Sequence, residues 1–183
     1  MSEWLFAWRQ VQAFLDTGGV VLWAIVGLSL VLWTLVLERY WFYRRVYPGR
    51  VRTWVERWRL RADKASWRAQ RIREGMVAEA RRQLGHTLPL IKTLVALCPL
   101  FGLLGTVTGM IQVFDVLAVT GTGNPRAMAS GVARATLPTM AGMVVAIAGL
   151  YFSTRLQHAS RMRVQYLRDE LGVVEGEAAD APA

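Results

Sequence analysis

The sequence has few of the residues that catalytic and metal sites need, with one cysteine and two histidines in 183 residues. Cys98 alone permits neither an intrachain disulfide nor a zinc site of several cysteines, and we expect it to pack as a small apolar residue. Neither His86 nor His158 has partners at metal-ligand spacing. The chain lacks a nucleotide-binding loop, and Ser153 and His158 have no supporting acid that would make them a catalytic pair. We therefore predict no enzymatic activity, no catalytic residue, no metal and no cofactor.

Charge is absent from three long stretches, which run from Thr17 to Leu37, from Thr93 to Phe114 and from Ala135 to Thr154. Each can cross the roughly 30 Å hydrocarbon core of a bilayer, which takes about 20 helical residues. A signal peptide is the rival interpretation of the first stretch, but its flanks lack a basic cluster and a small-residue cleavage site. The sequence therefore predicts an all-α integral membrane protein with three transmembrane helices, the last two long and extended into the cytoplasm. The predicted spans are residues 17–37, 93–119 and 132–154.

The net charge of +9 is distributed unevenly, and its distribution predicts the orientation in the membrane. Residues 38–92 contain 15 lysines and arginines against 5 aspartates and glutamates, whereas residues 120–131 contain a single charge, Arg126. Basic loops tend to remain in the cytoplasm. We therefore predict a basic helical cytoplasmic loop at 38–92, a periplasmic turn at 120–131 and a cytoplasmic extension at 155–183. This topology explains the basic excess, so the charge does not indicate nucleic-acid binding.

Three local patterns add detail to this organisation. Residues 1–16 carry tryptophans and leucines at helical spacing, which predicts a periplasmic amphipathic helix on the bilayer surface, separated from the first span by Gly18 and Gly19. Alternating arginines and glutamates without proline predict one helix from Arg50 to Leu84. The last helix is predicted to end at Gly172, and a disordered acidic tail follows it.

Small residues recur in the second and third spans. In the third span they follow one another in alternating steps of four and three, which places them on one face of a helix. They are Ala135, Thr139, Gly142, Ala146, Gly149 and Ser153 in the third span, and Gly102, Gly105, Thr106 and Gly109 in the second. The pattern predicts close helix packing and, for one short chain with such faces on two helices, a homo-oligomer. By itself it also fits helix packing without a role in transport.

Polar and helix-breaking residues in these spans indicate surroundings other than lipid. Pro99 and Pro138 each leave a backbone carbonyl without its helical hydrogen bond, and such a carbonyl needs water, a hydroxyl or another partner inside a membrane. Asp115 and Arg134 lie towards the outer ends of neighbouring antiparallel helices, where an ion pair between them is one hypothesis. Snorkelling of Arg134 to the outer interface is the alternative.

Two motifs, GLLGTVTGM (Gly102 to Met110) and GVARATLPTMAGMVVAI (Gly131 to Ile147), resemble the MotA/TolQ/ExbB proton-channel family, and its ExbB branch most closely. The resemblance implies a pentamer in the bacterial inner membrane around the transmembrane helices of an ExbD-like single-span partner, which carries a membrane-embedded aspartate. Proton entry to that aspartate would drive a motor that acts through a TonB-like protein on outer-membrane transport. Thr106 and Thr139 match the family's threonines and are expected to line the pore and the proton pathway.

One position departs from the family pattern. Where many members have a glutamate early in the third span, this chain has Arg134, so the glutamate's proposed role does not transfer to this chain. A TolQ-like or flagellar-type stator with another output stays open, as does a passive membrane scaffold without ion coupling.

Overall fold

The computed structural model describes residues 2–64, 66–120 and 125–179, and these residues are almost entirely helical. Its elements are α1 (Ser2–Trp41), the π-helical segment η1 (Phe42–Val46), α2 (Tyr47–Arg59), α3 (Trp67–Gly85), α4 (Leu88–Thr120) and α5 (Pro125–Ala179). No strand occurs within the described ranges, and three helical stretches are long and apolar enough to cross a membrane. The prediction of an all-α membrane protein with three transmembrane helices is therefore confirmed.

The chain divides into two compact units. The apolar unit comprises Met1–Thr34 and Lys92–Tyr151, and the charged unit comprises Leu35–Ile91 and Phe152–Ala183. The helices α1, α4 and α5 are long enough to contribute residues to both units. The charge-free stretches that the sequence predicts to cross the membrane fall largely within the apolar unit.

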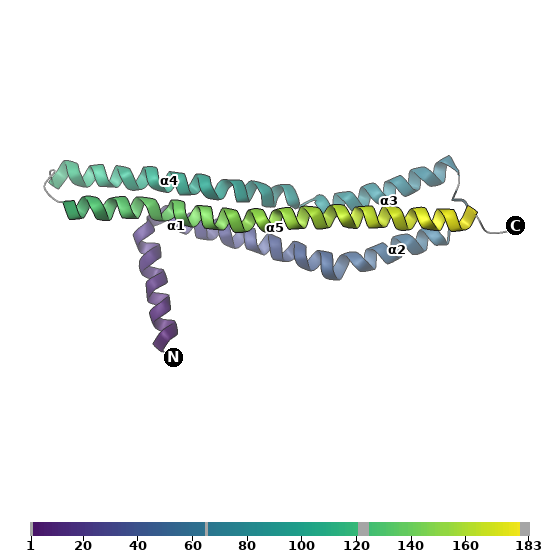
Figure 1. Cartoon of the computed structure of the whole chain (residues 1–183), viewed down its shortest axis with the longest axis horizontal. Coiled ribbons are helices and arrows are strands. Elements are labelled where there is room, and N and C mark those ends of the chain that lie inside the picture. The colour runs from purple at the N-terminus through teal and green to yellow at the C-terminus, as the bar shows by residue number, and fades with distance from the viewer. Residues whose placement is uncertain (1, 65, 121–124, 180–183) are drawn as a thin grey trace. The chain divides into compact units, whose positions relative to one another are not determined.

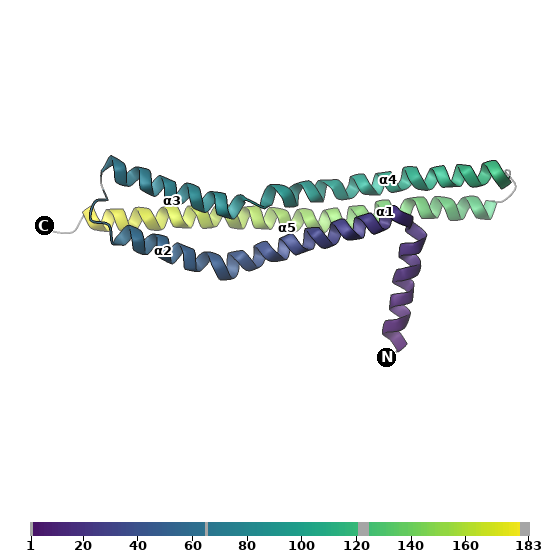
Figure 2. The same ribbon diagram turned by 180° about the vertical axis from the view of Figure 1, so that it is seen from behind.

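In the apolar unit, α4 and α5 run side by side in opposite directions, as both views show (Figures 1 and 2). The part of α1 that belongs to this unit packs against both helices, with Val21 beside Gly105 of α4 and Leu32 beside Gly149 of α5. The residues of α1 that are buried recur at helical spacing, whereas other large apolar residues of α1 are exposed. In this part of α1 the described buried residues are Leu22, Ile25 and Leu32, and the exposed ones include Trp23, Leu30 and Val31. One face of α1 therefore packs on protein, and the other is suited to lipid.

The helix α1 bends at Gly19, where the backbone has φ 68° and ψ −166°. This combination is essentially restricted to glycine, because a Cβ atom would clash with the backbone. Figure 1 shows the residues before Gly19 leaving the direction of the rest of α1. The bend lies at the glycine pair where the sequence predicts a break. Among residues 1–16, Arg9 and Gln12 are the side chains that the structure describes, and both are exposed.

In the charged unit, α2 and α3 lie on either side of the C-terminal part of α5 (Figures 1 and 2). Large buried side chains fill the space between the three helices, with Trp58 from α2, Leu84 from α3, and Leu167 and Leu171 from α5. Burying one such side chain stabilises a fold by about 2 kcal/mol. This unit is therefore a small three-helix bundle with an apolar core.

The prediction of one helix from Arg50 to Leu84 is wrong, because the chain forms two helices there, α2 and α3. Ser66 caps the start of α3, and its hydroxyl oxygen accepts a hydrogen bond from the Ala69 N–H at 3.2 Å. The Asp63 carboxylate in turn accepts a hydrogen bond from the Ser66 N–H at 3.0 Å. These side chains satisfy backbone donors that a continuous helix would satisfy internally, so they stabilise the turn.

The prediction of a turn over residues 120–131 is also wrong in its extent. The helix α4 continues to Thr120, and α5 begins at Pro125, so residues 125–131 are helical. Proline suits the first turn of a helix, because its φ is already helical. An N–H in that turn would have no acceptor within the helix, so its absence costs no hydrogen bond. Residues 121–124, which join the two helices, lie outside the described ranges.

The C-terminal end of α5 differs from prediction as well. The helix continues through Gly172 to Ala179, so the predicted stop at Gly172 and the predicted disorder of residues 175–179 are wrong. A glycine ends a helix most readily when it adopts positive φ, and among described residues positive φ occurs at Gly19 alone. The remaining residues of the predicted tail, 180–183, lie outside the described ranges.

Candidate functional site

The candidate site lies in the apolar unit, where the backbones of α4 and α5 approach each other closely. A Cβ atom at Gly102 would lie 2.9 Å from the Thr139 Cα, and one at Gly142 would lie 2.6 Å from a carbonyl oxygen of α4. A Cβ atom at Gly109 would lie 2.7 Å from the Ala135 Cα. Such distances are shorter than van der Waals contact, so only glycine fits at these positions without a shift of the helices. Close approach of this kind is how small residues hold membrane helices together.

Two further glycines of this contact face side chains. A Cβ atom at Gly105 would lie 2.4 Å from the Pro138 Cβ, and one at Gly149 would lie 2.7 Å from the Val95 Cγ2. Ala146, another small member of the predicted face, is half-buried. The glycines named from the sequence therefore lie where α4 and α5 meet.

Gly131 belongs to the same contact, although the sequence interpretation places it in a turn. A Cβ atom at Gly131 would lie 2.3 Å from the Val113 Cγ2 of α4. The signal for this residue is present in the sequence, because Gly131 precedes Ala135 by four residues and so continues the spacing of the small-residue face. The sequence interpretation missed Gly131 because it placed residues 120–131 in a turn.

The Thr139 side chain connects α5 to α4 through a hydrogen bond. Its hydroxyl donates a hydrogen bond to the Gly102 carbonyl oxygen, with 2.9 Å between the oxygens. The preceding Pro138 is fully buried inside α5 and has no N–H to donate to the helix. The Thr139 hydroxyl hydrogen is thus used within the chain, while the lone pairs of its oxygen can accept hydrogen bonds.

Thr106 uses its hydroxyl within its own helix. It donates to the Leu103 carbonyl oxygen at 2.7 Å, and Thr106 as a whole is half-exposed. This local bond satisfies the hydroxyl hydrogen without another helix, and it also leaves acceptor lone pairs. Thr106 lies four residues beyond Gly102, the partner of Thr139, which is about 6 Å along the helix axis. The structure therefore brings the two threonines to within about one helical turn in depth.

Asp115 and Arg134 form no ion pair within the described part of the chain, and both side chains are exposed. The ion pair that is one hypothesis for these residues is therefore absent among the described residues. Arg134 borders a cavity of about 180 Å³ between α4 and α5, and Gln112 is the other polar residue that lines it. Asp115 does not line this cavity, because it lies on another face of α4 than Gln112 and Val113.

Large apolar side chains cover the outward faces of α4 and α5. They include Leu100, Leu103, Val107, Ile111 and Phe114 on α4, and Met140, Met143, Val144, Ile147 and Leu150 on α5. An exposed apolar surface of this extent requires lipid or other protein around it. The half-exposed Thr106 and Thr108 are polar exceptions on this part of α4.

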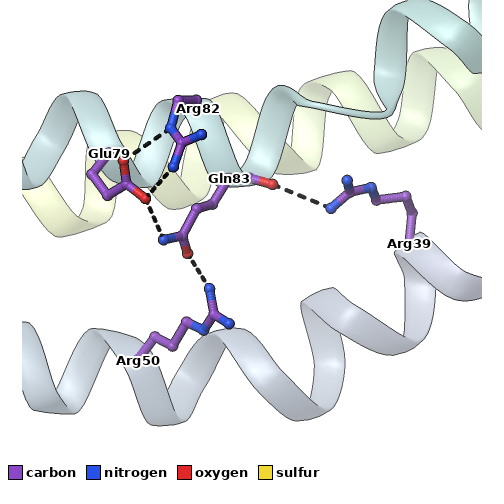
Figure 3. Close-up of polar contacts among 5 residues, drawn as sticks. All are labelled: Arg39, Arg50, Glu79, Arg82 and Gln83. Atoms are coloured by element: carbon purple, nitrogen blue, oxygen red, sulfur yellow. Dashed lines mark hydrogen bonds and ion pairs between the residues drawn. The ribbon is translucent and has the colours of Figure 1, made fainter.

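A polar cluster in the charged unit is missing from the sequence predictions. Arg39 is 6% exposed, and it donates hydrogen bonds to the Gln83 carbonyl oxygen at 3.2 Å and to the Thr87 hydroxyl. The Gln83 side chain accepts from Arg50 and donates to Glu79 at 2.6 Å (Figure 3). These contacts join α1 and α2 to α3.

The sequence does contain a signal for the burial of Arg39. Val36 and Tyr43, which are buried, lie three residues before and four residues after Arg39. Helical spacing therefore places this arginine on the buried face. A search at that spacing for apolar residues alone does not identify Arg39.

Across the described ranges, no group of three histidine, cysteine, aspartate or glutamate side chains could hold a metal ion.

Comparison with known proteins connects the chain to one family. Residues 49–169 match the model of the MotA/TolQ/ExbB proton channel family. The matched range includes Thr106 and Thr139 and most of the contact between α4 and α5.

Individual relatives agree with the family match. The biopolymer transport protein ExbB-like 1 of Synechocystis sp. is 32% identical, and the alignment covers 78% of this chain and 68% of that protein. ExbB-like 3 of the same organism is 25% identical over 86% of this chain and 90% of its own length. The biopolymer transport protein exbB1 of Vibrio cholerae is 40% identical over 70 residues, which are 38% of this chain and 31% of that protein.

Proposed function

This chain belongs to the MotA/TolQ/ExbB proton channel family, and from this premise we propose that it is the ExbB-type subunit of a proton-driven motor in the bacterial inner membrane. The motor would energise TonB-dependent transport across the outer membrane. The observation that carries this proposal is the glycine-built pairing of α4 and α5, with the hydroxyls of Thr106 and Thr139 within about one helical turn of each other in depth.

The subunit would work as a homo-oligomer, with five copies expected from the family resemblance. Two features support assembly: the apolar outward faces of α4 and α5 need a covering, and close backbone contact joins the two helices into one surface. The copies would enclose the transmembrane helices of an ExbD-like single-span partner, and a TonB-like protein would receive the motion. The proton carrier would be an aspartate within the partner's transmembrane helix.

Thr106 and Thr139 would line the pore and contact that aspartate or its water. Both hydroxyl hydrogens are donated within the chain, so the oxygens offer lone pairs. A protonated aspartic acid can donate its own O–H to such an oxygen, whereas an ionised aspartate needs donors. The observed arrangement thus favours the neutral acid, and binding of the ionised form would require a threonine hydroxyl to turn. Proton uptake and release would then change which hydrogen bonds join the partner to the wall.

The orientation follows from the charge distribution. Residues 1–16 and the junction between α4 and α5 would face the periplasm, and residues 38–92 and 155–183 would face the cytoplasm. Arg134 would supply a positive charge near the periplasmic end of the pathway, beside Gln112 and its cavity. Asp115 lies away from that cavity, so the chain's own carboxylate is poorly placed to relay protons.

The proposal is tested by removing one hydroxyl at a time. Thr106→Val and Thr139→Val keep the shape of the side chain and delete its oxygen. We expect each to lower proton flux roughly fivefold or more, because the O–H of the protonated aspartic acid would lose its acceptor, and an unsatisfied buried donor costs about 1–3 kcal/mol. Flux is measured with a pH-sensitive dye in vesicles that contain the chain and its co-purified single-span partner.

Matched controls separate the hydroxyl from general damage. Thr139→Ser should keep the flux, and so should Thr108→Val, since Thr108 makes a similar bond to its own helix outside the two family positions. Size-exclusion chromatography shows whether each variant assembles. Normal flux in both valine variants would contradict the pore assignment, and absence of flux in the unaltered complex would favour a passive scaffold. Normal TonB-dependent uptake but a leaky envelope in a deletion strain would favour a TolQ-like output.

A further inference from the structure

A shallow cavity of about 240 Å³, wide open to the surface, lies in the charged unit between the end of α1, the start of α2 and the end of α3. Three arginines line it, Arg39, Arg50 and Arg82, together with His86 and the ring of Phe42. Gln83 and the carboxylate of Glu38 complete the lining. A cavity of this size has room for several groups as large as a water molecule, which takes about 30 Å³.

In the topology that the charge pattern predicts, the cavity lies just beyond the hydrocarbon, where lipid headgroups are expected. The first charge-free stretch ends at Leu37, so Glu38 and Arg39 are the first charged residues beyond the hydrocarbon. His86 shortly precedes the second charge-free stretch, which begins at Thr93. The adjoining Tyr40 and Trp41 are exposed, and such amphipathic rings favour the membrane interface.

Phe42 holds two of the guanidinium groups in place. The Arg39 Cζ lies 5.3 Å from the centre of its ring, and the Arg50 Cζ lies 5.6 Å from it. Arg39 is further fixed by its hydrogen bonds to Gln83 and Thr87, and the Arg39 Nε lies 3.6 Å from the Glu38 carboxylate, beyond hydrogen-bond distance. The two guanidinium groups therefore lie against the same ring, close to each other.

Glu79 holds the third arginine from outside the cavity. Arg82 donates to its carboxylate through Nε at 3.0 Å and Nη2 at 2.8 Å (Figure 3). The hydrogen bonds from Arg82 and Gln83 lower the pKa of Glu79 to about 2, so the carboxylate is ionised at neutral pH. With Glu38 and Glu79 both counted against three arginines, the cluster keeps a positive excess.

We propose that this cavity binds the phosphate of an anionic glycerophospholipid in the leaflet at this end of the spans, which is the cytoplasmic leaflet in the orientation proposed above. Guanidinium groups match phosphate because they offer paired N–H donors in a plane. A free phosphate has the same chemistry, but the headgroup depth and the neighbouring exposed aromatic rings favour a lipid. The bound headgroup would join the first span to α3 through Arg39, Arg50 and Arg82.

The test measures lipid binding to the purified full-length chain by native mass spectrometry, without partner or proton flux. It therefore succeeds or fails independently of the motor proposal. Arg50→Gln is the test variant, because Arg50 is exposed and its loss leaves the buried contacts of Arg39 in place. Arg52→Gln is the matched control, since Arg52 is an exposed arginine of α2 that does not line the cavity.

We expect phosphatidylglycerol to bind the unaltered chain at least about tenfold more tightly than phosphatidylcholine, and Arg50→Gln to remove most of that difference. Arg52→Gln should leave it unchanged. Equal loss in both variants would overturn the proposal, because it would indicate general attraction to basic helices. Equal binding of the two lipids would overturn it too, as would displacement of phosphatidylglycerol by inorganic phosphate at equal concentration.

Discussion

The apolar unit and the charged unit are both bundles of helices, but different contacts hold their helices together. In the apolar unit α4 and α5 meet through Gly102, Gly109 and Gly142, where there is no room for a side chain. In the charged unit α2 and α5 contribute large side chains such as Trp58 and Leu167, which are fully buried. The same secondary structure is thus stabilised in two ways within one chain.

The difference follows from the surroundings that each unit is suited to. Lipid tails are as apolar as leucine, so burying a large side chain between membrane helices gains little, and close backbone contact and interhelical hydrogen bonds matter more. The bond from Thr139 to the Gly102 carbonyl oxygen is such a contact. In water, removing a large apolar side chain from solvent is the dominant gain. Loss of a large side chain should therefore destabilise the charged unit, whereas addition of a side chain at a contact glycine should destabilise the apolar unit.

The largest expected effect is that of Trp58→Ala in the charged unit. Trp58 is fully buried, and its replacement should lower the free energy of unfolding by about 3–5 kcal/mol through the cavity it leaves. Unfolding of the purified protein in mixed micelles, followed by circular dichroism, measures the change. Trp67→Ala is the control, because Trp67 is 72% exposed and its loss should cost less than about 1 kcal/mol. Equal effects would mean that the charged unit has no packed core.

A smaller loss is expected when a side chain is added in the apolar unit. Gly142→Ala should lower the free energy of unfolding by roughly 1–3 kcal/mol, because the new methyl group would overlap a backbone carbonyl of α4. The same unfolding measurement applies. Gly27→Ala on α1 is the control, since a Cβ atom there meets nothing within 4 Å. A neutral Gly142→Ala would show that the two helices are not closely packed.

The smallest effect should have the opposite sign. Gly75→Ala in α3 should raise the free energy of unfolding by about 1 kcal/mol, because alanine favours a helix over glycine and nothing lies within 4 Å of its Cβ atom. Differential scanning calorimetry should show a higher midpoint than that of the unaltered chain. A lower midpoint would contradict the distinction between glycines at helix contacts and a glycine on an open helix surface.

Much of the fold can be predicted from residue patterns, and the errors have local causes. The three spans are predictable because charge-free apolar stretches of about 20 residues are rare outside membrane helices, and the break at Gly19 because of the glycine pair. The separation of α2 from α3 is missed because it depends on Asp63 and Ser66, two short polar side chains in a stretch of arginines. At Gly172 the sequence predicts a helix end that does not occur, since a glycine permits a helix to end but does not require it.

The candidate sites, too, can be predicted from the sequence only in part. Thr106, Thr139 and the glycines around them can be named from spacing and from two motifs. The sequence gives no sign, however, that the Thr139 hydroxyl donates to Gly102 or that Asp115 and Arg134 stay apart. The cavity beside Arg39 is also beyond sequence reasoning, because residues 39, 50 and 82 come together only when three helices pack.

The amino-acid sequence by itself determined that this is a three-span helical membrane protein with small-residue faces on its last two spans. Hydropathy and helical spacing are properties of neighbouring residues, so each segment of the chain carries them on its own. Only the tertiary structure decided which glycines touch a backbone, where each threonine donates its hydrogen, and which arginines share a cavity. These depend on the approach of segments that are distant in the sequence, and a local pattern carries no record of that approach.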